Sequence, residues 1–163
     1  MHEEMSRIER ELMLLGRHAS MGSAGRCRSG DGQDRLERSA YLLLSRLEAA
    51  GPMSIGQLAE AFGLDCSTVN RQTAAILRAG LVERVPDPDG GLARRLRVTG
   101  EGTRRLRLDR EARIKNLSGL LDEWSPAELA VFARVLTRFN TAVERQEGEP
   151  WPREDAPGPG LPS

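Results

Sequence analysis

The sequence has few of the residues from which catalytic and metal sites are usually built. Its 163 residues include two cysteines and two histidines. Two cysteines cannot hold a metal ion by themselves, and they do not suggest a disulfide framework. Neither a Ser-His-Asp arrangement nor a phosphate-binding loop can be recognised. We therefore expect no enzyme, no cofactor and no metal site.

Long apolar runs are also missing. No stretch approaches the roughly 18 to 20 apolar residues that cross a bilayer, and the charged N-terminus lacks the apolar core of a secretory signal. Aromatic residues make up only 4% of the chain, so the core must consist of Leu, Val, Ile and Ala. Length and composition together predict one cytoplasmic domain of ordinary size, without membrane contact.

Net charge is absent too, since 24 basic residues balance 24 acidic ones. Their distribution is uneven, however. Residues 67–113 contain 11 arginines against 6 acidic residues, whereas residues 144–163 contain 5 acidic residues against 2 arginines. A surface that faces nucleic acid would therefore have to lie in the middle of the chain.

Apolar spacing and capping residues predict a mainly α-helical chain with a small β-hairpin. The clearest helix starts are Ser54 with Gln57, and Ser125 with Pro126 and Glu128. Helices are expected at residues 3–21, 34–50, 54–62, 65–79, 99–121 and 125–146. Two strands, 81–85 and 94–98, are joined by a segment dense in turn residues.

The short helices 54–62 and 65–79 meet at Gly63, and a strand, a turn and a strand follow them. This order is typical of a winged helix-turn-helix. Because the major groove of B-DNA admits one helix, the first residues of the second helix would reach the base edges. Asn70 and Arg71 are the predicted base contacts, since asparagine can pair with adenine and arginine with guanine.

Further predicted DNA contacts lie beside these two residues and on the wing. The set comprises Ser54, Ser67, Thr68, Thr73, Arg94 and Arg95. Ser67 and Thr68 are expected to hold phosphate, but a cap is also needed here, and either Asp65 or Ser67 can provide it. Helical spacing places Thr73 toward the inward side of its helix. Arg94 and Arg95 can alternatively belong to a solvated strand face.

Four segments carry a family resemblance: Ser54-Ile-Gly-Gln-Leu-Ala-Glu-Ala-Phe-Gly-Leu-Asp-Cys-Ser-Thr-Val-Asn-Arg71, Ile76-Leu-Arg-Ala-Gly-Leu-Val-Glu-Arg84, Asp87-Pro-Asp-Gly-Gly91 and Leu96-Arg-Val-Thr-Gly-Glu-Gly102. In this order they resemble the DNA-binding domain of the MarR family. With flanking helices of suitable length, the resemblance covers about residues 3–145. It implies a transcriptional regulator, expected to be a repressor, that binds a palindromic operator in double-stranded DNA.

The resemblance also implies an obligate homodimer built from the first and last helices. The apolar stripes of residues 5–15 and 129–143 agree with this, although packing within one chain is the alternative explanation. The expected division is an N-terminal dimerisation helix (1–21), a flexible glycine-rich connection (22–33), the winged helix-turn-helix domain (34–99), C-terminal dimerisation helices (100–146) and a disordered tail (147–163).

Two positions depart from the family pattern. Leu92 stands where many relatives have a wing-tip arginine that reaches the minor groove and is often held by an aspartate like Asp87. Either Arg94 or Arg95 would then have to replace it. Gln72 stands where the family usually has an apolar residue. The packing beneath helix 65–79, the recognition helix that would enter the major groove, is therefore expected to differ.

The resemblance further implies a small aromatic effector, often a phenol, bound between the dimerisation helices and the winged domain. His18, Met21 and Tyr41 are the candidate lining residues, and ordinary packing is the alternative role for each. A ligand of this kind acts by preferring one spacing of the recognition helices.

Two other possibilities remain open. Cys66 begins a helix and Cys27 lies between two arginines, and both surroundings favour thiol reactivity, so one alternative is a redox-sensing regulator. Neither cysteine lies near the start of the chain, where the resemblance would place a sensing cysteine. The other alternative is a winged-helix module that binds a protein instead of DNA.

Overall fold

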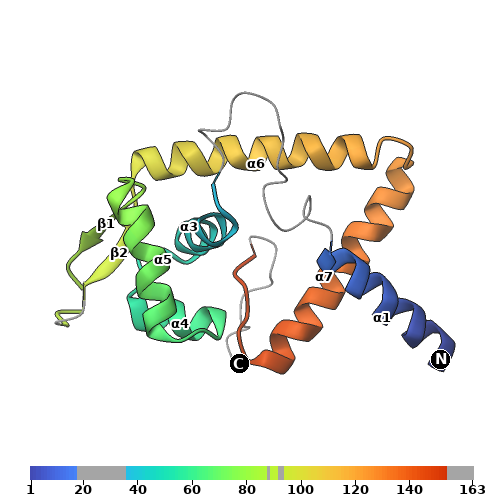
Figure 1. The fold of residues 1–163 in the computed structure, drawn as a ribbon, viewed down its shortest axis with the longest axis horizontal. Coiled ribbons are helices and arrows are strands. Elements are labelled where there is room, and N and C mark those ends of the chain that lie inside the picture. Colours follow the sequence, from blue (N-terminus) through green and yellow to red (C-terminus); the bar gives the residue numbers. More distant parts are fainter. Residues whose placement is uncertain (18–35, 88, 92–93, 154–163) are drawn as a thin grey trace, which may run out of the picture.

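The computed structural model describes residues 1–17, 36–87, 89–91 and 94–153 of the chain. Over these ranges the fold is mainly helical with one antiparallel hairpin, as predicted (Figure 1). The elements are α1 (His2–Arg17), α3 (Arg38–Ala50), α4 (Ile55–Phe62), α5 (Cys66–Arg78), β1 (Val82–Val85), β2 (Arg95–Val98), α6 (Gly100–Leu120) and α7 (Pro126–Glu147). None of the described helices is both long and apolar enough to cross a bilayer.

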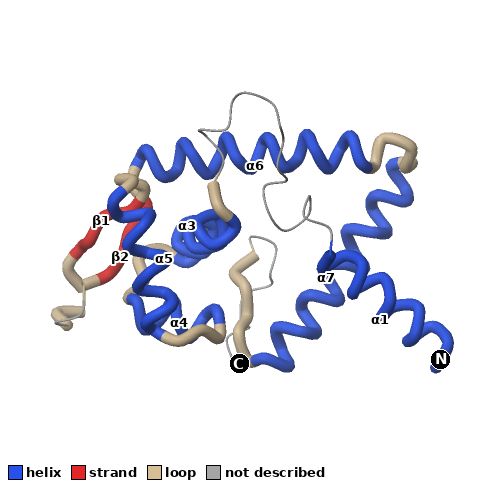
Figure 2. Tube along the Cα trace, in the orientation of Figure 1, coloured by secondary structure: helices blue, strands red, loops and turns tan. Residues whose placement is uncertain are grey.

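Helices α3, α4 and α5 and the hairpin pack into one lobe, and α6 leads away from it to α7 (Figure 2). Among the described residues of the lobe, no aromatic side chain is fully buried, in agreement with the composition. Its buried apolar residues are Leu36, Leu43, Leu44, Leu47, Leu58, Ala59, Val69, Ile76, Leu81, Val82, Leu96 and Leu106. Since Leu106 belongs to α6, the first half of that long helix is anchored in the lobe.

The predicted helix starts are confirmed where a cap and a reciprocal glutamine or glutamate occur together. Ser54 and Gln57 form a capping box on α4, and Ser125 and Glu128 form one on α7. Helix α3 begins at Arg38 with Glu37 as its N-cap. The expected start at Asp34 is therefore wrong, because Leu36 and Glu37 already lie outside the helix.

The hairpin is tied to the segment that precedes α4. Strands β1 and β2 pair from Val82 with Val98 to Val85 with Arg95. Met53 forms a short β-bridge with the free edge of β2, because its N–H and carbonyl exchange hydrogen bonds of 3.1 and 2.7 Å with Leu96. This hairpin, which we call the wing, and the helix-turn-helix of α4 and α5 are thus joined by backbone hydrogen bonds as well as by the core.

The chain passes from β2 into α6 through a closely packed corner. The Thr99 hydroxyl donates to the Gly80 carbonyl at 2.7 Å and accepts from the Gly102 N–H at 3.1 Å. Gly102 is buried against the backbone of Leu81, where an added Cβ would lie 2.0 Å from the carbonyl oxygen. Only glycine fits at this contact, which sets the direction in which α6 leaves the lobe.

The expectation that residues 147–163 are disordered is wrong for residues 147–153. Helix α7 continues to Glu147, and Gly148 ends it in the left-handed conformation, with φ 80°. The following residues return to the lobe and contact it through Trp151. Composition alone emphasises the proline and glycine of this segment and misses its anchoring side chains. Residues 154–163 lie outside the described ranges.

Gly102→Ala is expected to lower the free energy of unfolding by about 1 to 3 kcal/mol, because an added methyl group overpacks the corner. Urea denaturation followed by circular dichroism measures this change. Gly100→Ala is the matched control, since no atom of the described residues lies within 4 Å of its added Cβ, and alanine favours the helix. Equal stability of the two variants would contradict the close approach of α6 to Leu81.

Candidate nucleic-acid interface

Helix α5 has one side in the core and one side in solvent. Val69 and Ile76 are buried against the lobe, at 0% and 2% exposure. Asn70 and Arg71 are exposed. Both polar side chains therefore lie outside the lobe, on the side of α5 that the described residues leave open to a DNA groove. The geometry agrees with what base reading by Asn70 and Arg71 requires.

Thr73 is on the buried side of the same helix. Its side chain is 1% exposed, and its hydroxyl donates to the carbonyls of Val69 and Asn70 at 2.8 and 3.1 Å. The prediction that Thr73 contacts DNA is therefore wrong. Its position four residues after Val69 places it one turn further along the inward face.

Asp65 organises the beginning of α5. Its carboxylate accepts hydrogen bonds from the Thr68 N–H at 2.8 Å, from the Thr68 hydroxyl at 2.7 Å and from the Ser67 hydroxyl. These bonds to the ionised form, those from the Ser67 and Thr68 side chains above all, hold the pKa of Asp65 far below its ordinary value of 3.8. Asp65 is thus the N-cap.

This arrangement changes the expected role of the two hydroxyl groups. Ser67 and Thr68 both donate their hydroxyl hydrogens to Asp65. A hydroxyl must donate in order to bind a phosphate oxygen, so in this conformation neither is free to do so. The capping explanation, left open for Ser67, fits the geometry better, with Ser67 and Thr68 supporting the cap that Asp65 provides.

A second polar surface lies between the start of α4 and the wing. Ser54, Gly56, Arg84 and Arg94 border a hollow of about 510 Å³ there, together with Ile55 and Leu96. Ser54 is occupied as the α4 cap, accepting from the Gln57 N–H at 3.1 Å. Arg84 was not among the predicted contacts. Its place beside Arg94 follows from the cross-strand pairing of Arg84 with Leu96, a register that spacing alone left open.

The two wing arginines differ in their surroundings. Arg95 lies 2.7 Å from Asp87 and 2.9 Å from Asp89, and its side chain is only 20% exposed. It therefore holds the wing turn together. Arg94 is exposed and borders the hollow just described. Of the two candidates to replace a wing-tip arginine, Arg94 is the one placed to reach outward. Leu92 lies outside the described residues.

Of the expected effector residues, only Tyr41 lies in the described part of the chain, on α3. It is half-buried, and the Arg113 guanidinium of α6 stacks 4.1 Å from the centre of its ring. His18 and Met21, like Cys27, lie outside the described residues. Cys66 is a free, exposed thiol at the first position of α5.

Gln72 lies between the two sides of α5, and it is half-buried. It borders a hollow of about 310 Å³, together with Arg38, Leu42 and Leu64. The expected difference in packing at this position therefore takes the form of a partly open space beside α5. Among the described residues, no group of three or more His, Cys, Asp or Glu is arranged to hold a metal ion.

Comparison with known protein families finds that the MarR family model matches residues 36–90. Two curated proteins of Bacillus subtilis (strain 168) are similar, both described as uncharacterized HTH-type transcriptional regulators. YxaD is 38% identical over 135 residues, which cover 83% of this chain and 92% of that protein. YsmB is 27% identical over 106 residues, covering 65% and 73%.

Solved structures with the same fold include a MarR family protein from Bacillus stearothermophilus and the transcriptional regulator SlyA. The first has a TM-score of 0.65 at 23% identity and covers 86% of this chain and 94% of its own. The second has a TM-score of 0.65 at 21% identity, with coverage of 86% and 96%. At these identities the likeness concerns the fold.

Asp65→Asn is expected to weaken the acid dependence of stability. The lowered pKa means that the Asp65 carboxylate stabilises the fold above the ordinary carboxyl pKa, and that this contribution is lost as the pH falls toward the lowered value. Asparagine keeps a capping oxygen but does not titrate. Urea denaturation at several pH values from about 5 downward, with Asp122→Asn as the charge control, tests this. An unchanged pH slope would contradict the assigned cap.

Proposed function

Because the chain belongs to the MarR family of transcriptional regulators, whose members bind DNA, we propose that it is a homodimeric repressor of a palindromic operator. The observation that carries this proposal is the division of α5, which is buried along Val69 and Ile76 and exposed at Asn70 and Arg71. A helix held in this way can enter the major groove without losing its support from the lobe.

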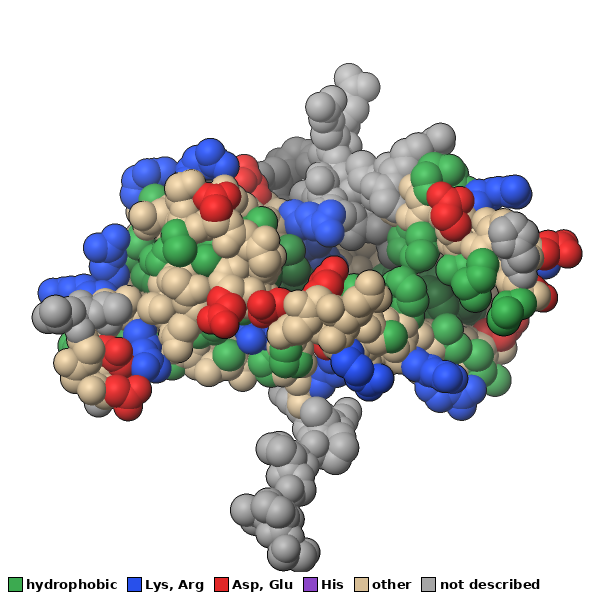
Figure 3. Space-filling view, turned by 90° about the horizontal axis from the view of Figure 1, so that it is seen from below, with side chains coloured by type: hydrophobic (Ala, Val, Ile, Leu, Met, Phe, Trp, Pro, Cys, Tyr) green, Lys and Arg blue, Asp and Glu red, His purple; other side chains and the backbone are tan. Residues whose placement is uncertain are grey.

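The proposed homodimer is supported by the apolar surfaces of α1 and α7. Helix α7 has 22 residues, none of which is buried. Six large apolar side chains of α7 and four of α1 are 37 to 56% exposed: Leu129, Val131, Phe132, Val135, Leu136, Phe139, Met5, Ile8, Leu12 and Leu15. Figure 3 shows hydrophobic side chains gathered at the end of the molecule formed by these two helices. Patches of this kind mark interfaces, and a two-fold axis would cover both copies at once.

In the proposed complex, the two copies of α5 enter successive major grooves about 34 to 36 Å apart. Asn70 and Arg71 read adenine and guanine in each half-site. Arg84 and Arg94 neutralise phosphates beside the wing, which adds affinity without adding sequence preference. The N-terminus of α4, which Ser54 caps, faces the same DNA phosphates in this complex.

We also propose that a small aromatic effector controls release. A hollow of about 630 Å³ lies between α3, α6 and the residues that follow α7, bordered by Ser45, Glu48, Arg110, Trp151 and Arg153. Tyr41 is one turn before Ser45 on α3, and Arg113, which stacks on its ring, pairs with the buried Asp109 at 2.6 Å. An aromatic ligand with an acidic group would use Arg110, which is paired with Glu48 at 2.7 Å. It would weaken DNA binding if it fitted a different spacing of the two lobes.

Selection of bound sites from random DNA duplexes, with and without candidate aromatic acids, tests the proposal. We expect enrichment of an inverted repeat whose half-sites are centred about 10 base pairs apart, and weaker enrichment with an effector. A protein-interaction module would show no enriched repeat and no salt-dependent retention on DNA. That outcome would refute the proposed operator binding.

Two arginine variants should separate base reading from phosphate contact. Arg71→Ala is expected to cost about 1 to 3 kcal/mol of operator binding and to relax preference at one base, whereas Arg94→Ala should reduce the salt slope by about 1. Fluorescence anisotropy over a series of salt concentrations measures both effects. Arg145→Ala, on α7, controls for the loss of one positive charge. Unchanged affinity and slope in the first two variants would exclude the proposed DNA-facing surface.

A further inference from the structure

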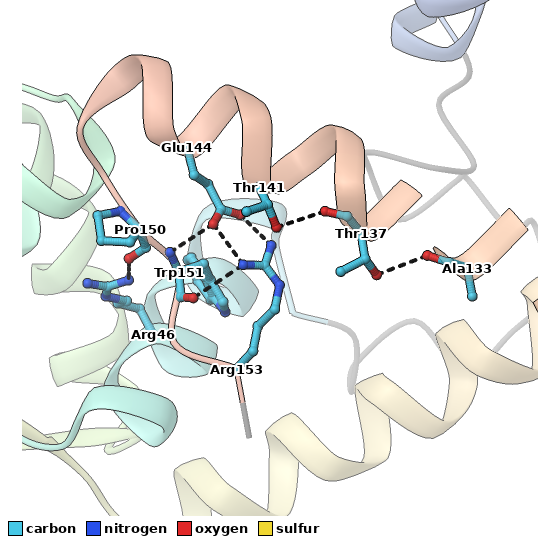
Figure 4. Close-up of polar contacts among 8 residues, drawn as sticks. All are labelled: Arg46, Ala133, Thr137, Thr141, Glu144, Pro150, Trp151 and Arg153. Atoms are coloured by element: carbon cyan, nitrogen blue, oxygen red, sulfur yellow. Dashed lines mark hydrogen bonds and ion pairs between the residues drawn. The ribbon is translucent and has the colours of Figure 1, made fainter. Parts of the chain in front are cut away.

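A short segment after α7 returns to the DNA-binding lobe. We call residues 148–153 the C-terminal strap. It begins at Gly148, where the N–H groups of Gly148 and Glu149 both donate to the Glu144 carbonyl, at 2.9 and 3.1 Å. It then crosses from the end of α7 to α3 and α4 (Figure 4). The strap therefore touches both the helix that carries the apolar surface and the lobe that carries α5.

On the lobe side, the contacts are made by Trp151. Its ring meets Phe62 of α4 edge to face, with centroids 6.0 Å apart. The Arg46 guanidinium of α3 lies 5.4 Å from the centre of the same ring, and Arg46 Nη1 also donates to the Pro150 carbonyl at 2.8 Å. Two elements of the lobe thus hold one aromatic side chain of the strap.

On the helix side, Glu144 of α7 closes the strap. Its two carboxylate oxygens accept from both terminal nitrogens of Arg153, at 2.7 and 2.5 Å, and one of them also accepts from the Trp151 N–H at 3.2 Å. The two side chains are 19% and 31% exposed. The bonds from Arg153 keep the pKa of Glu144 below its ordinary value, so the pair is ionised around neutral pH.

The strap gives α7 a second connection to the lobe. Along the chain, the first connection is α6, a helix of 21 residues followed by a turn. Figure 1 shows that the strap meets the lobe at the opposite end of α7 from that turn. A helix attached at one end can swing about its turn, whereas attachment at both ends restricts the angle.

We propose that Trp151, Arg153 and Glu144 are positioning residues that fix the distance between the recognition helix α5 and the helix α7. This inference rests on the proposed function for its consequence, since in a dimer joined through α7 that distance sets the separation of the two α5 helices. The strap itself need not contact DNA. It acts by restricting the protomer to the geometry that fits one half-site spacing.

Distances measured within one protomer test the positioning role without any DNA. Cys27→Ser leaves Cys66, at the start of α5, as the single thiol, and Arg134→Cys adds an exposed site on α7. Spin labels on both, diluted with unlabelled protein so that only pairs within a protomer are seen, report the distance distribution. We expect a narrow distribution that broadens in Trp151→Ala and in Glu144→Gln.

Two further variants serve as controls. Trp151→Phe keeps an aromatic ring against Phe62 and Arg46, and Glu149→Ala alters the strap at a residue whose backbone forms the helix cap; both should keep the narrow distribution. Circular dichroism verifies that each variant is folded. Equal widths in Trp151→Ala, Glu144→Gln and the unaltered strap would overturn the proposal.

A series of operators with different half-site spacings gives the functional readout. The protein with an intact strap should prefer one spacing, Trp151→Ala should lose most of that preference, and Arg71→Ala should weaken binding to all spacings alike. If no variant binds DNA, the proposed function fails, while the distance distributions still decide the role of the strap. If DNA is bound but Trp151→Ala keeps both the preference and the narrow distribution, the strap does not position α5.

Discussion

The contact between the inward side of α5 and the core of the lobe is the constraint on which the rest of the molecule depends. Val69, Thr73 and Ile76 are almost completely buried, so α5 cannot rotate about its axis without exposing apolar surface and the Thr73 hydroxyl. This fixes which residues remain outside. Asn70 and Arg71 are exposed to solvent because Val69, Thr73 and Ile76 hold the opposite side of the helix in the core.

The lobe and helix α7 differ in how far their apolar side chains are buried. The apolar side chains of the lobe are buried against one another. Backbone hydrogen bonds between Met53 and Leu96 join its wing to its helix-turn-helix. Helix α7 differs, because none of its residues is buried and six of its large apolar side chains are exposed. A second copy would cover the exposed apolar side chains of α7. Any restraint between α7 and the lobe would then set the distance between the two recognition helices. The C-terminal strap lies where such a restraint is needed.

Local signals in the sequence predicted the helices and the hairpin well, because caps and turns depend on neighbouring residues. Ser54 with Gln57 and Ser125 with Glu128 form the boxes that their spacing indicates. The exposed position of Asn70 and Arg71 also follows from helical periodicity. Composition was a poorer guide to the chain after Gln146, because Trp151 is held there by Arg46, 105 residues earlier in the sequence.

The sequence by itself determined the order of the elements, the face of α5 that is buried and the family to which the chain belongs, since all three depend on residues close together along the chain. Only the tertiary structure decided that Arg95 is held by Asp87 and Asp89 while Arg94 and Arg84 border one hollow. It also decided that the strap returns to α3 and α4. These contacts depend on register and on long-range packing, in which side chains with similar local surroundings meet different partners.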